Sequence, residues 1–291
     1  MLSNESKRCT MSIEYTLKIN MNKLSKEEFR KQHHSRNAGL LTEVEQSKIC
    51  DTTLMIAGCG VGSQIALSAV RIGFEKFIIV DGDRVELSNN NRQGYSWRDE
   101  GRFKVDALAR RIKAINPHAH VRKYPVFIDT KNAEKIVRKA DIVIDSIDPD
   151  AAQAVIAMHR AAQKDHKYVI QPTDIGWGAL VYVFSPTSKT YEEMLGLDPK
   201  ISIDKINNEE AFGKFVEYFI ELMPPYVQKM ALEVAEGKGA HYPQPVSAAN
   251  ILSALTVVAA KRVALGLPVK LAPEYAIFDP NIALDPNAKT S

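Results

Sequence analysis

The fold of this chain is decided by residues 54–81, LMIAGCGVGSQIALSAVRIGFEKFIIVD. The apolar run at 54–57 is typical of a buried parallel strand. A glycine-rich turn follows, and residues 64–71 then place apolar side chains on one face of a predicted helix. A second apolar run, 77–80, predicts another strand. Strand, helix and strand in this order predict a βαβ unit.

The turn between the first strand and the helix contains Gly58, Gly60 and Gly62. Glycines there let backbone N–H groups approach a phosphate at the helix N-terminus, where the helix dipole favours negative charge. Asp81 ends the second strand 19 positions after Gly62, and an acid about 20 residues after such a turn usually binds ribose hydroxyls. Alone, the turn also fits a tight connection without a ligand, because its pattern is Gly-x-Gly-x-Gly-Ser.

A polar segment follows the second strand at residues 81–104, DGDRVELSNNNRQGYSWRDEGRFK. Core-forming sequence has no reason to crowd so many polar groups behind a buried strand. Acids, amides and cations in this order are suited to hold a nucleoside triphosphate and to neutralise its phosphates. Taken singly, Arg92 and Lys104 also fit solvated surface cations, and residues 89–91 fit a plain loop.

Residues 81–93 resemble the nucleotide signature of the E1-like (ThiF/MoeB) adenylating enzymes, which activate a carboxylate by transfer of AMP from ATP. Residues 100–104 with 115–117 resemble the next helix of that family and its end. Residues 141–148 resemble the strand whose last acid approaches magnesium, and residues 36–42 resemble the N-terminal arm. The resemblance spans about residues 30–185.

The resemblance implies a set of roles in binding ATP. Asp81 would bind the ribose, and Asp83 would help to position its loop. Asn89, Arg92 and Gln93 would hold the phosphates beside the glycine turn.

The resemblance also implies the catalytic groups. Lys104 would neutralise charge on the α-phosphate, and Asp148 would hold Mg²⁺, with Asp145 left open as the alternative ligand. Arg36 would reach the active site of the other subunit of a homodimer, with Arg30 on the same arm as the alternative. The family glycine turn has two adjacent glycines, whereas this chain has Ala57 and Cys59 at two of the glycine positions.

The chain has 3 cysteines, Cys9, Cys50 and Cys59, and no Cys-x-x-Cys motif. The structural zinc of many relatives is therefore not expected. Since no cysteine follows the nucleotide segment, we expect no covalent thiol intermediate, and another nucleophile would attack the adenylate directly. So few cysteines also fit a reducing cytosol.

The composition is that of an ordinary globular protein of 291 residues, with 45% hydrophobic and 25% charged residues. A net charge of +3 is too small to argue for nucleic acid, although basic residues at 102–113 leave tRNA open. We expect no membrane span and no signal-peptide core, and hence a cytoplasmic location.

Strands alternating with helices predict an α/β fold, a doubly wound Rossmann-like and mostly parallel sheet with helices on both faces. We expect residues 1–48 to form an N-terminal strand and helical arm, with Leu40, Leu41 and Val44 on the apolar face of the arm. Residues 49–185 would form the nucleotide-binding core. Residues 186–291 would form the acceptor and dimer-interface region, including a small-residue helix at 247–265 and a last strand at 275–278.

These features together predict ATP-dependent adenylation of a carboxylate, with a peptide, a small carrier protein or a small carboxylate as acceptor. Trp177, between two glycines, would cover the nucleotide or pack on substrate, or else anchor a turn. One rival is an NAD-dependent oxidoreductase, which shares the βαβ unit but needs neither Arg92 nor Lys104. The other rival is a catalytically silent subunit that binds a partner.

Overall fold

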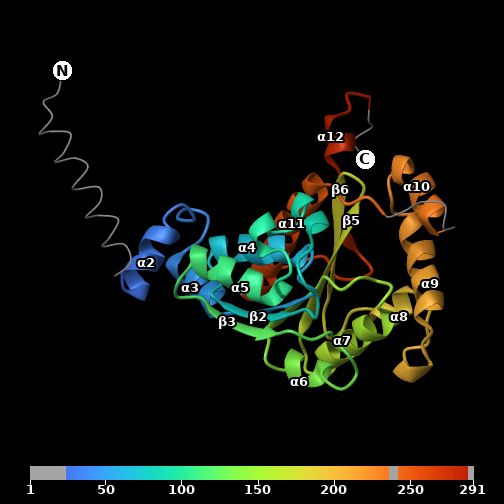
Figure 1. The fold of residues 1–291 in the computed structure, drawn as a ribbon, viewed down its shortest axis with the longest axis horizontal. Coiled ribbons are helices and arrows are strands. Elements are labelled where there is room, and N and C mark those ends of the chain that lie inside the picture. The colour runs from blue at the N-terminus through green and yellow to red at the C-terminus, as the bar shows by residue number, and fades with distance from the viewer. Residues whose placement is uncertain (1–23, 236–241, 288–291) are drawn as a thin grey trace, which may run out of the picture.

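The computed structural model describes residues 24–235 and 242–287, which form one mixed sheet covered by helices (Figure 1). The strands are β1 (Thr53–Ala57), β2 (Lys76–Val80), β3 (His120–Tyr124), β4 (Ile142–Asp145), β5 (Tyr168–Ile175), β6 (Gly178–Phe184) and β7 (Tyr275–Phe278). Their order is β3-β2-β1-β4-β5-β6-β7. The first five are parallel, whereas β6 runs antiparallel to both β5 and β7. The predicted α/β sheet is confirmed; the strand expected within residues 1–23 lies outside the described residues.

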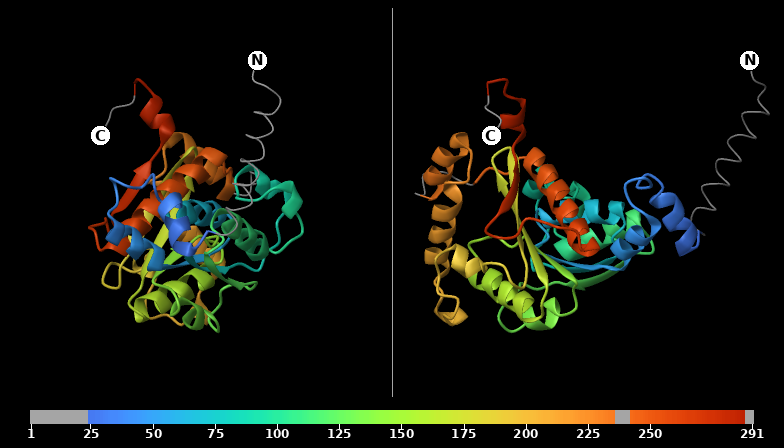
Figure 2. Two further views of the ribbon diagram at one scale, coloured as in Figure 1. Left: turned by 90° about the vertical axis from the view of Figure 1, so that its left-hand side faces the viewer. Right: turned by 180° about the vertical axis from the view of Figure 1, so that it is seen from behind.

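Helices cover both faces of the sheet, and each face has its own apolar core. One face carries α3 (Glu43–Asp51), α4 (Gly62–Ile72), α5 (Lys104–Ile115) and α11 (Val246–Leu265). The other carries α6 (Ala133–Val137), α7 (Ala152–Lys164), α8 (Tyr191–Met194) and α9 (Asn208–Ile220). The remaining helices are α2 (Lys26–His33), α10 (Pro225–Ala235) and α12 (Pro280–Leu284), with short 3₁₀ turns η1 (Leu87–Asn91), η2 (Trp97–Asp99) and η3 (Ile203–Lys205). Figure 2 shows α2 and α9 at opposite ends of the molecule.

The chain reverses its direction of sheet growth at β1, which has β2 on one side and β4 on the other. Gly58 follows β1, and Ser146 follows β4, so the two connections meet at the carboxyl ends of the strands. A Cβ atom on Gly58 would overlap the carbonyl oxygen of Ser146, and Gly58 has a φ of +83°. Ligands in doubly wound sheets bind at such a switch point, so this edge is the first place to look for a site.

The described part of the N-terminal arm is helical, but it is not one continuous helix. It folds as α2 and α3, separated by a turn at Gly39 with a φ of +93°. Thr42 caps α3 in a capping box with Glu45. The expected apolar face was wrong, because Leu40 is 89% and Val44 is 68% exposed. Leu41 lies in the turn and is only partly buried.

Helix α11 is long and apolar enough, by composition, to cross a membrane. Its Leu252, Val257 and Ala260 are buried in the core that α4 and the sheet share. Ser253 donates a hydrogen bond to the Gln64 carbonyl oxygen at 3.0 Å. Small side chains along α11 allow this close approach, so it serves as a core helix of the fold.

Candidate active site

A cleft of about 440 Å³ lies at the carboxyl ends of β1, β2 and β4. Separate parts of the chain form its walls: the glycine turn, Asp81, η1 and the start of α5. The predicted site residues that line it are Gly58, Gly60, Asp81, Asp83, Asn89, Arg92, Gln93, Lys104 and Asp148. Arg36 and Gly62 do not line it.

The glycine turn offers free backbone donors to this cleft. Helix α4 begins at Gly62 with no side-chain cap, and no acceptor for the N–H groups of Gly60, Val61 or Gly62 occurs among the described residues. Gly62 supports the turn by packing, since a Cβ atom there would lie 2.8 Å from the Ile56 side chain. The N-terminus of α4 is therefore suited to bind an anion.

Asp81 holds the turn in place. Its two carboxylate oxygens accept hydrogen bonds from the backbone N–H of Cys59 at 2.6 Å and of Asp83 at 2.7 Å. Burial raises the pKa of Asp81, while the Lys104 charge and these two N–H groups partly offset that effect. The Cys59 side chain is buried in the core, so this cysteine, at a position where the resemblance implies a glycine, does not block the turn.

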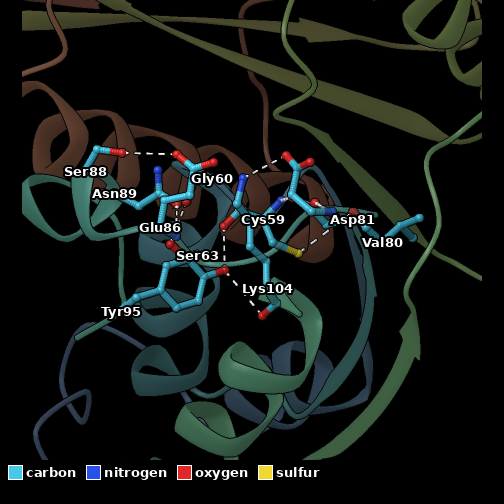
Figure 3. A network of polar contacts seen from close by, with 11 residues as sticks. Cys59, Gly60, Ser63, Val80, Asp81, Glu86, Ser88, Asn89, Tyr95 and Lys104 are labelled. Carbon is cyan, nitrogen blue, oxygen red and sulfur yellow. Dashed lines mark hydrogen bonds and ion pairs between the residues drawn. The ribbon is translucent and has the colours of Figure 1, made fainter. Parts of the chain in front are cut away.

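A second set of hydrogen bonds joins the turn to the polar segment behind it (Figure 3). The Tyr95 hydroxyl donates to the Cys59 carbonyl oxygen at 2.7 Å and lies 3.4 Å from that of Lys104. Ser63 Oγ donates to the Gly60 carbonyl oxygen at 2.6 Å and accepts from the Gly94 N–H at 2.8 Å. The turn and the cleft wall are thus one connected unit.

The two amide side chains differ in how their oxygen atoms are paired. Asn89 Oδ1 accepts from the Glu86 N–H at 3.0 Å and so closes the η1 turn. Gln93 is buried, and its Oε1 has no hydrogen-bond partner among the described residues. Its Nε2 lies 3.4 Å from where a Cβ on Gly60 would stand. A phosphate needs the N–H groups of these amides, and neither amide nitrogen donates a hydrogen bond among the described residues, so both side chains keep a donor for it.

The cations in the cleft are held by neighbouring oxygens. Lys104 Nζ lies 3.0 Å from Asp83 Oδ2, and its side chain is 11% exposed. Arg92 Nε donates to Gln244 Oε1 at 2.7 Å, and Nη1 donates to the Ser88 carbonyl oxygen at 3.1 Å. Gln244, 152 residues further along the chain, was not predicted, because no local pattern marks it.

The structure separates the two acids that the sequence left open. Asp145 has a fully buried side chain and lies 2.9 Å from His159 Nε2, so it is engaged in the core. Asp148 lines the cleft and is accessible to solvent. Loss of solvent around the carboxylate raises the pKa of Asp148, and the neighbouring Asp150 carboxylate raises it further. Of the two, Asp148 is the one placed to reach a metal ion in the cleft.

The carboxylates of the cleft fit Mg²⁺ bound together with phosphates. No group of three or more His, Cys, Asp or Glu side chains is placed to hold a metal ion within residues 24–235 and 242–287. Mg²⁺ commonly uses one or two carboxylates, with water and substrate phosphates completing its octahedron. Asp148 with Asp150 beside it supplies that donor type.

The two arm arginines occupy different environments. Arg30 forms a bidentate pair with Glu75, with both N–O distances 2.7 Å, and the Glu75 side chain is fully buried. Arg36 is exposed and does not line the cleft of its own chain. Arg30 is thus used in folding, which leaves Arg36 as the candidate for an arm cation.

Two further expectations concern surface residues. Trp177 is 49% exposed and does not line the cleft; its backbone N–H donates to the Tyr226 hydroxyl at 3.0 Å. It therefore sits at the β5–β6 turn rather than over the cleft. In the basic segment at 102–113, Arg110 and Arg111 both pair with Asp99, which weakens that segment as a surface for nucleic acid.

The described cysteines are unreactive. Cys59 and Cys50 are free and buried. Burial raises the pKa of the Cys59 thiol well above its usual value, and burial raises that of Cys50 as well. A neutral thiol is a poor nucleophile.

Comparisons with known proteins agree with this arrangement. A family model described as "ThiF family" matches residues 34–281. A probable molybdopterin-synthase adenylyltransferase of Gracilaria tenuistipitata var. liui is 31% identical over 153 residues, which cover 50% of this chain and 42% of that protein. The sulfur carrier protein adenylyltransferase of Thermus thermophilus is 31% identical over 126 residues, covering 43% of this chain and 46% of that protein. The chain spans less than half the length of either relative.

Solved structures share the fold. PaaA superposes with a TM-score of 0.63 at 21% identity, covering 88% of this chain and 71% of that one. Escherichia coli MccB with ATP gives 0.59 at 17%, covering 81% and 65%. The E. coli tRNA N6-threonylcarbamoyladenosine dehydratase gives 0.57 at 19%, covering 81% and 95%.

Proposed function

This chain belongs to the ThiF family, and from that premise we propose that it is an adenylyltransferase that activates a carboxylate with ATP. The observation that carries the proposal is the meeting of Asp81, Arg92, Lys104 and Asp148 in one cleft at the switch point of the sheet. An oxidoreductase using NAD needs the βαβ unit and Asp81 but has no use for the other three. A silent subunit has no use for any of them.

The reaction requires one bond to form and one to break. A carboxylate oxygen of the acceptor attacks the α-phosphorus of ATP, and the bond from that phosphorus to the bridging oxygen of the β-phosphate breaks. The products are an acyl-adenylate and pyrophosphate. No side-chain nucleophile is needed, so the buried, neutral thiol of Cys59 fits a route without a covalent cysteine intermediate.

The chain supplies positioning and charge for this step. Asp81 orients the ribose, and the free N–H groups at the start of α4 bind phosphate oxygens. Gln93 offers the N–H group of its Nε2, which lies beside Gly60, to the same phosphates. Lys104, released from Asp83 by competition with phosphate, neutralises charge at the reacting phosphorus.

Asp148 would hold Mg²⁺, directly or through water, with the ion contacting ATP phosphates. When bound, the ion withdraws charge from the leaving pyrophosphate. Arg92, which also lines the cleft, offers its guanidinium to the phosphates.

We further propose a homodimer in which Arg36 of each chain completes the site of the other. The support is that Arg36 is exposed on the arm, while its alternative, Arg30, is occupied by Glu75. The relatives are named for a sulfur carrier protein and for molybdopterin synthase, and MccB has been solved with MccA. A carrier protein, a peptide or a small carboxylate is the corresponding class of acceptor here.

Calorimetric titration with Mg-ATP and with NAD tests the proposal. We expect Mg-ATP to bind the wild type, and Asp81→Ala, Arg92→Ala and Lys104→Ala each to weaken binding or turnover at least about 10-fold. Lys123→Ala is the matched control, since Lys123 forms an exposed ion pair with Asp106 and does not line the cleft. Binding of NAD alone would identify an oxidoreductase, and binding of neither nucleotide would identify a silent subunit.

A further inference from the structure

The nucleotide cleft continues into a second cavity of about 530 Å³, which we call the acceptor pocket. Several residues line both cavities, among them Arg92, Asp148, Asp150 and Gln244. A group at this junction therefore touches both spaces. A cavity of this size is typical of a small-molecule or single-residue ligand.

One wall of the acceptor pocket is apolar and comes from the helices at the far end of the sheet. Phe212 and Phe215 of α9 stack with ring centroids 6.3 Å apart and planes 13° apart. The other apolar members of this wall are Val216, Met223 and Ala231. Figure 1 shows α9 and α10 standing together beside the ends of β5 and β6.

The opposite wall is polar and is made by an overhang of the sheet. Strand β5 pairs with β4 only as far as Ile170. Beyond that point it continues with β6 alone, through Asp174, which pairs with Ala179. The β5–β6 hairpin therefore extends past the carboxyl end of β4 and presents Asp174 to the pocket.

Asp174 carries an unpaired acceptor. Its Oδ2 atom is buried and has no hydrogen-bond partner among the described residues. Burial raises the pKa of Asp174, an effect that the nearby charge of Arg92 and the amide of Gln244 only partly offset. A buried carboxyl oxygen without a donor is costly for the fold, so a donor from a ligand would repay that cost.

The charges around the pocket set the polarity of its ligand. Among the described residues of the lining, Arg92 is the single cation, and it stands at the junction with the nucleotide cleft together with Asp148 and Asp150. The carboxylates in the lining are Asp145, Asp148, Asp150 and Asp174. At the junction Arg92 is the group that a ligand carboxylate can pair with, between the carboxylates of Asp148 and Asp150. Deeper in the pocket Asp174 favours a cationic or N–H group.

We propose that the acceptor pocket binds the residue that bears the reacting carboxylate, with an apolar side chain of leucine or phenylalanine size against α9 and an N–H donor on Asp174. This inference rests on the proposed function, whose acceptor it specifies. The required chemistry is an α-amino acid unit with an apolar side chain. A terminal glycine would leave the apolar wall without a partner. The same unit occurs in a free amino acid and at the C-terminus of a peptide, and these two sources are distinguished below.

The test uses defined probes with the full chain, Mg-ATP and hydroxylamine, which traps an acyl-adenylate as a hydroxamate and releases AMP. The probes are phenylalanine, glycine, 3-phenylpropionate, glycyl-phenylalanine and glycyl-glycine. We expect phenylalanine-type probes to exceed their glycine partners in kcat/KM by roughly 10- to 100-fold, from burial of the side chain. Phenylalanine should exceed 3-phenylpropionate at least about 10-fold, from the bond to Asp174.

The comparison of phenylalanine with glycyl-phenylalanine identifies the source. A preference for the first indicates a free amino acid, and a preference for the second indicates a peptide terminus; either supports the pocket. Equal or better use of the glycine probes overturns the inference. So does the absence of turnover with every probe while Mg-ATP still binds. Failure of Mg-ATP to bind instead overturns the proposed function.

Two variants connect the selectivity to the pocket. Asp174→Leu should raise KM for phenylalanine at least about 10-fold and leave 3-phenylpropionate nearly unchanged. Val216→Trp should fill the pocket and abolish the preference for phenylalanine over glycine. Both should keep the Kd of Mg-ATP, which separates substrate recognition from misfolding. Val258→Trp, on the exposed side of α11, is the control; unchanged selectivity in the pocket variants would overturn the assignment.

Discussion

The carboxylate of Asp81 accepts a hydrogen bond from the backbone N–H of Cys59 at 2.6 Å. This bond joins the end of β2 to the turn after β1, so the residue proposed to bind ribose also fixes the loop proposed to bind phosphate. A second bond, from the Asp83 N–H at 2.7 Å, uses the other carboxylate oxygen. Binding and loop shape therefore depend on the same side chain.

Asp81→Ala should lose both the ribose contact and the support of the phosphate-binding loop. Two backbone N–H groups lose their acceptor, so the free energy of unfolding should fall by about 1–2 kcal/mol while the chain remains folded. Asp81→Asn retains one acceptor oxygen and should lie between Asp81→Ala and the wild type in stability. Chemical denaturation measures the order. An Asp81→Ala protein as stable as wild type would show that the turn holds its shape without this contact.

Gly58 allows the two connections at the switch point to touch. Gly58→Ala introduces a Cβ that overlaps the Ser146 carbonyl oxygen. It also places a non-glycine residue at a φ of +83°, which strains the backbone. Gly101→Ala is the matched control, because Gly101 has a φ of +75° but nothing within 4 Å of an added Cβ. We expect about 1 kcal/mol of destabilisation for Gly101→Ala from backbone strain. Gly58→Ala should cost more and should also weaken Mg-ATP binding; equal losses would exclude a role for the Ser146 contact.

The centre of the sheet was predictable because β1, β2 and β4 are continuous apolar runs between turns. The helix expected at 64–71 and the strand at 77–80 appear within a residue or two as α4 and β2. The family resemblance is confirmed over residues 34–281. The arm was misread, since Leu40, Leu41 and Val44 have helical spacing, yet Gly39 breaks the helix and Thr42 starts a new one. The Thr42–Glu45 capping pattern was the available signal.

The site was predictable where a local motif carries it and not where distant segments meet. The polar segment at 81–104 and Asp148 were found from their order along the chain. Gln244 and Asp174 reach the pocket only when the residues before α11 and the β5–β6 overhang come together. No spacing rule records that meeting. The choice between Asp145 and Asp148 likewise required the position of His159.

Cys59 should be dispensable for catalysis. Its thiol is buried, and burial raises its pKa well above the usual value, so no thiolate is present at neutral pH. Cys59→Ala should retain adenylation within about 3-fold and lose roughly 1 kcal/mol of stability from the smaller side chain. Hydroxamate formation in the presence of hydroxylamine measures the activity. A complete loss in a folded Cys59→Ala protein would restore the thiol to the mechanism.

Arg30 and Arg36 should separate stability from activity. Arg30→Ala leaves the buried carboxylate of Glu75 with Lys26 as its one ion-pair partner within the described part of the chain, so stability should fall by about 1–3 kcal/mol. Arg36→Ala should leave stability within about 0.5 kcal/mol of wild type and reduce turnover at least about 10-fold.

Complementation tests whether Arg36 acts across a dimer. A mixture of Arg36→Ala and Lys104→Ala, co-refolded, forms some dimers in which one site has both an intact arm from its neighbour and its own Lys104. We expect such mixtures to regain up to about a quarter of wild-type activity per subunit, while neither variant alone is active. No recovery, in a mixture shown by native mass spectrometry to contain the mixed dimer, would place Arg36 outside the neighbouring site.

Asp174 should cost the folded protein stability at neutral pH. Its pKa is raised above 3.8 by burial, so the native state holds its proton more tightly than the unfolded chain does. The stability that this proton contributes is fully present below pH 3.8 and is lost as the pH rises through the higher native value. Asp174→Asn removes the ionisation, so its free energy of unfolding should exceed that of wild type by on the order of 1 kcal/mol at pH 7 and match it near pH 3.5.

Asp81 and Asp148 have pKa shifts of the same sign, which is why the variant must be compared with wild type at each pH. Urea denaturation at both values measures the difference. A gain of equal size at pH 3.5 and pH 7 would mean that the Asp174 carboxyl does not ionise with a raised pKa, and that its oxygen is already satisfied within the fold.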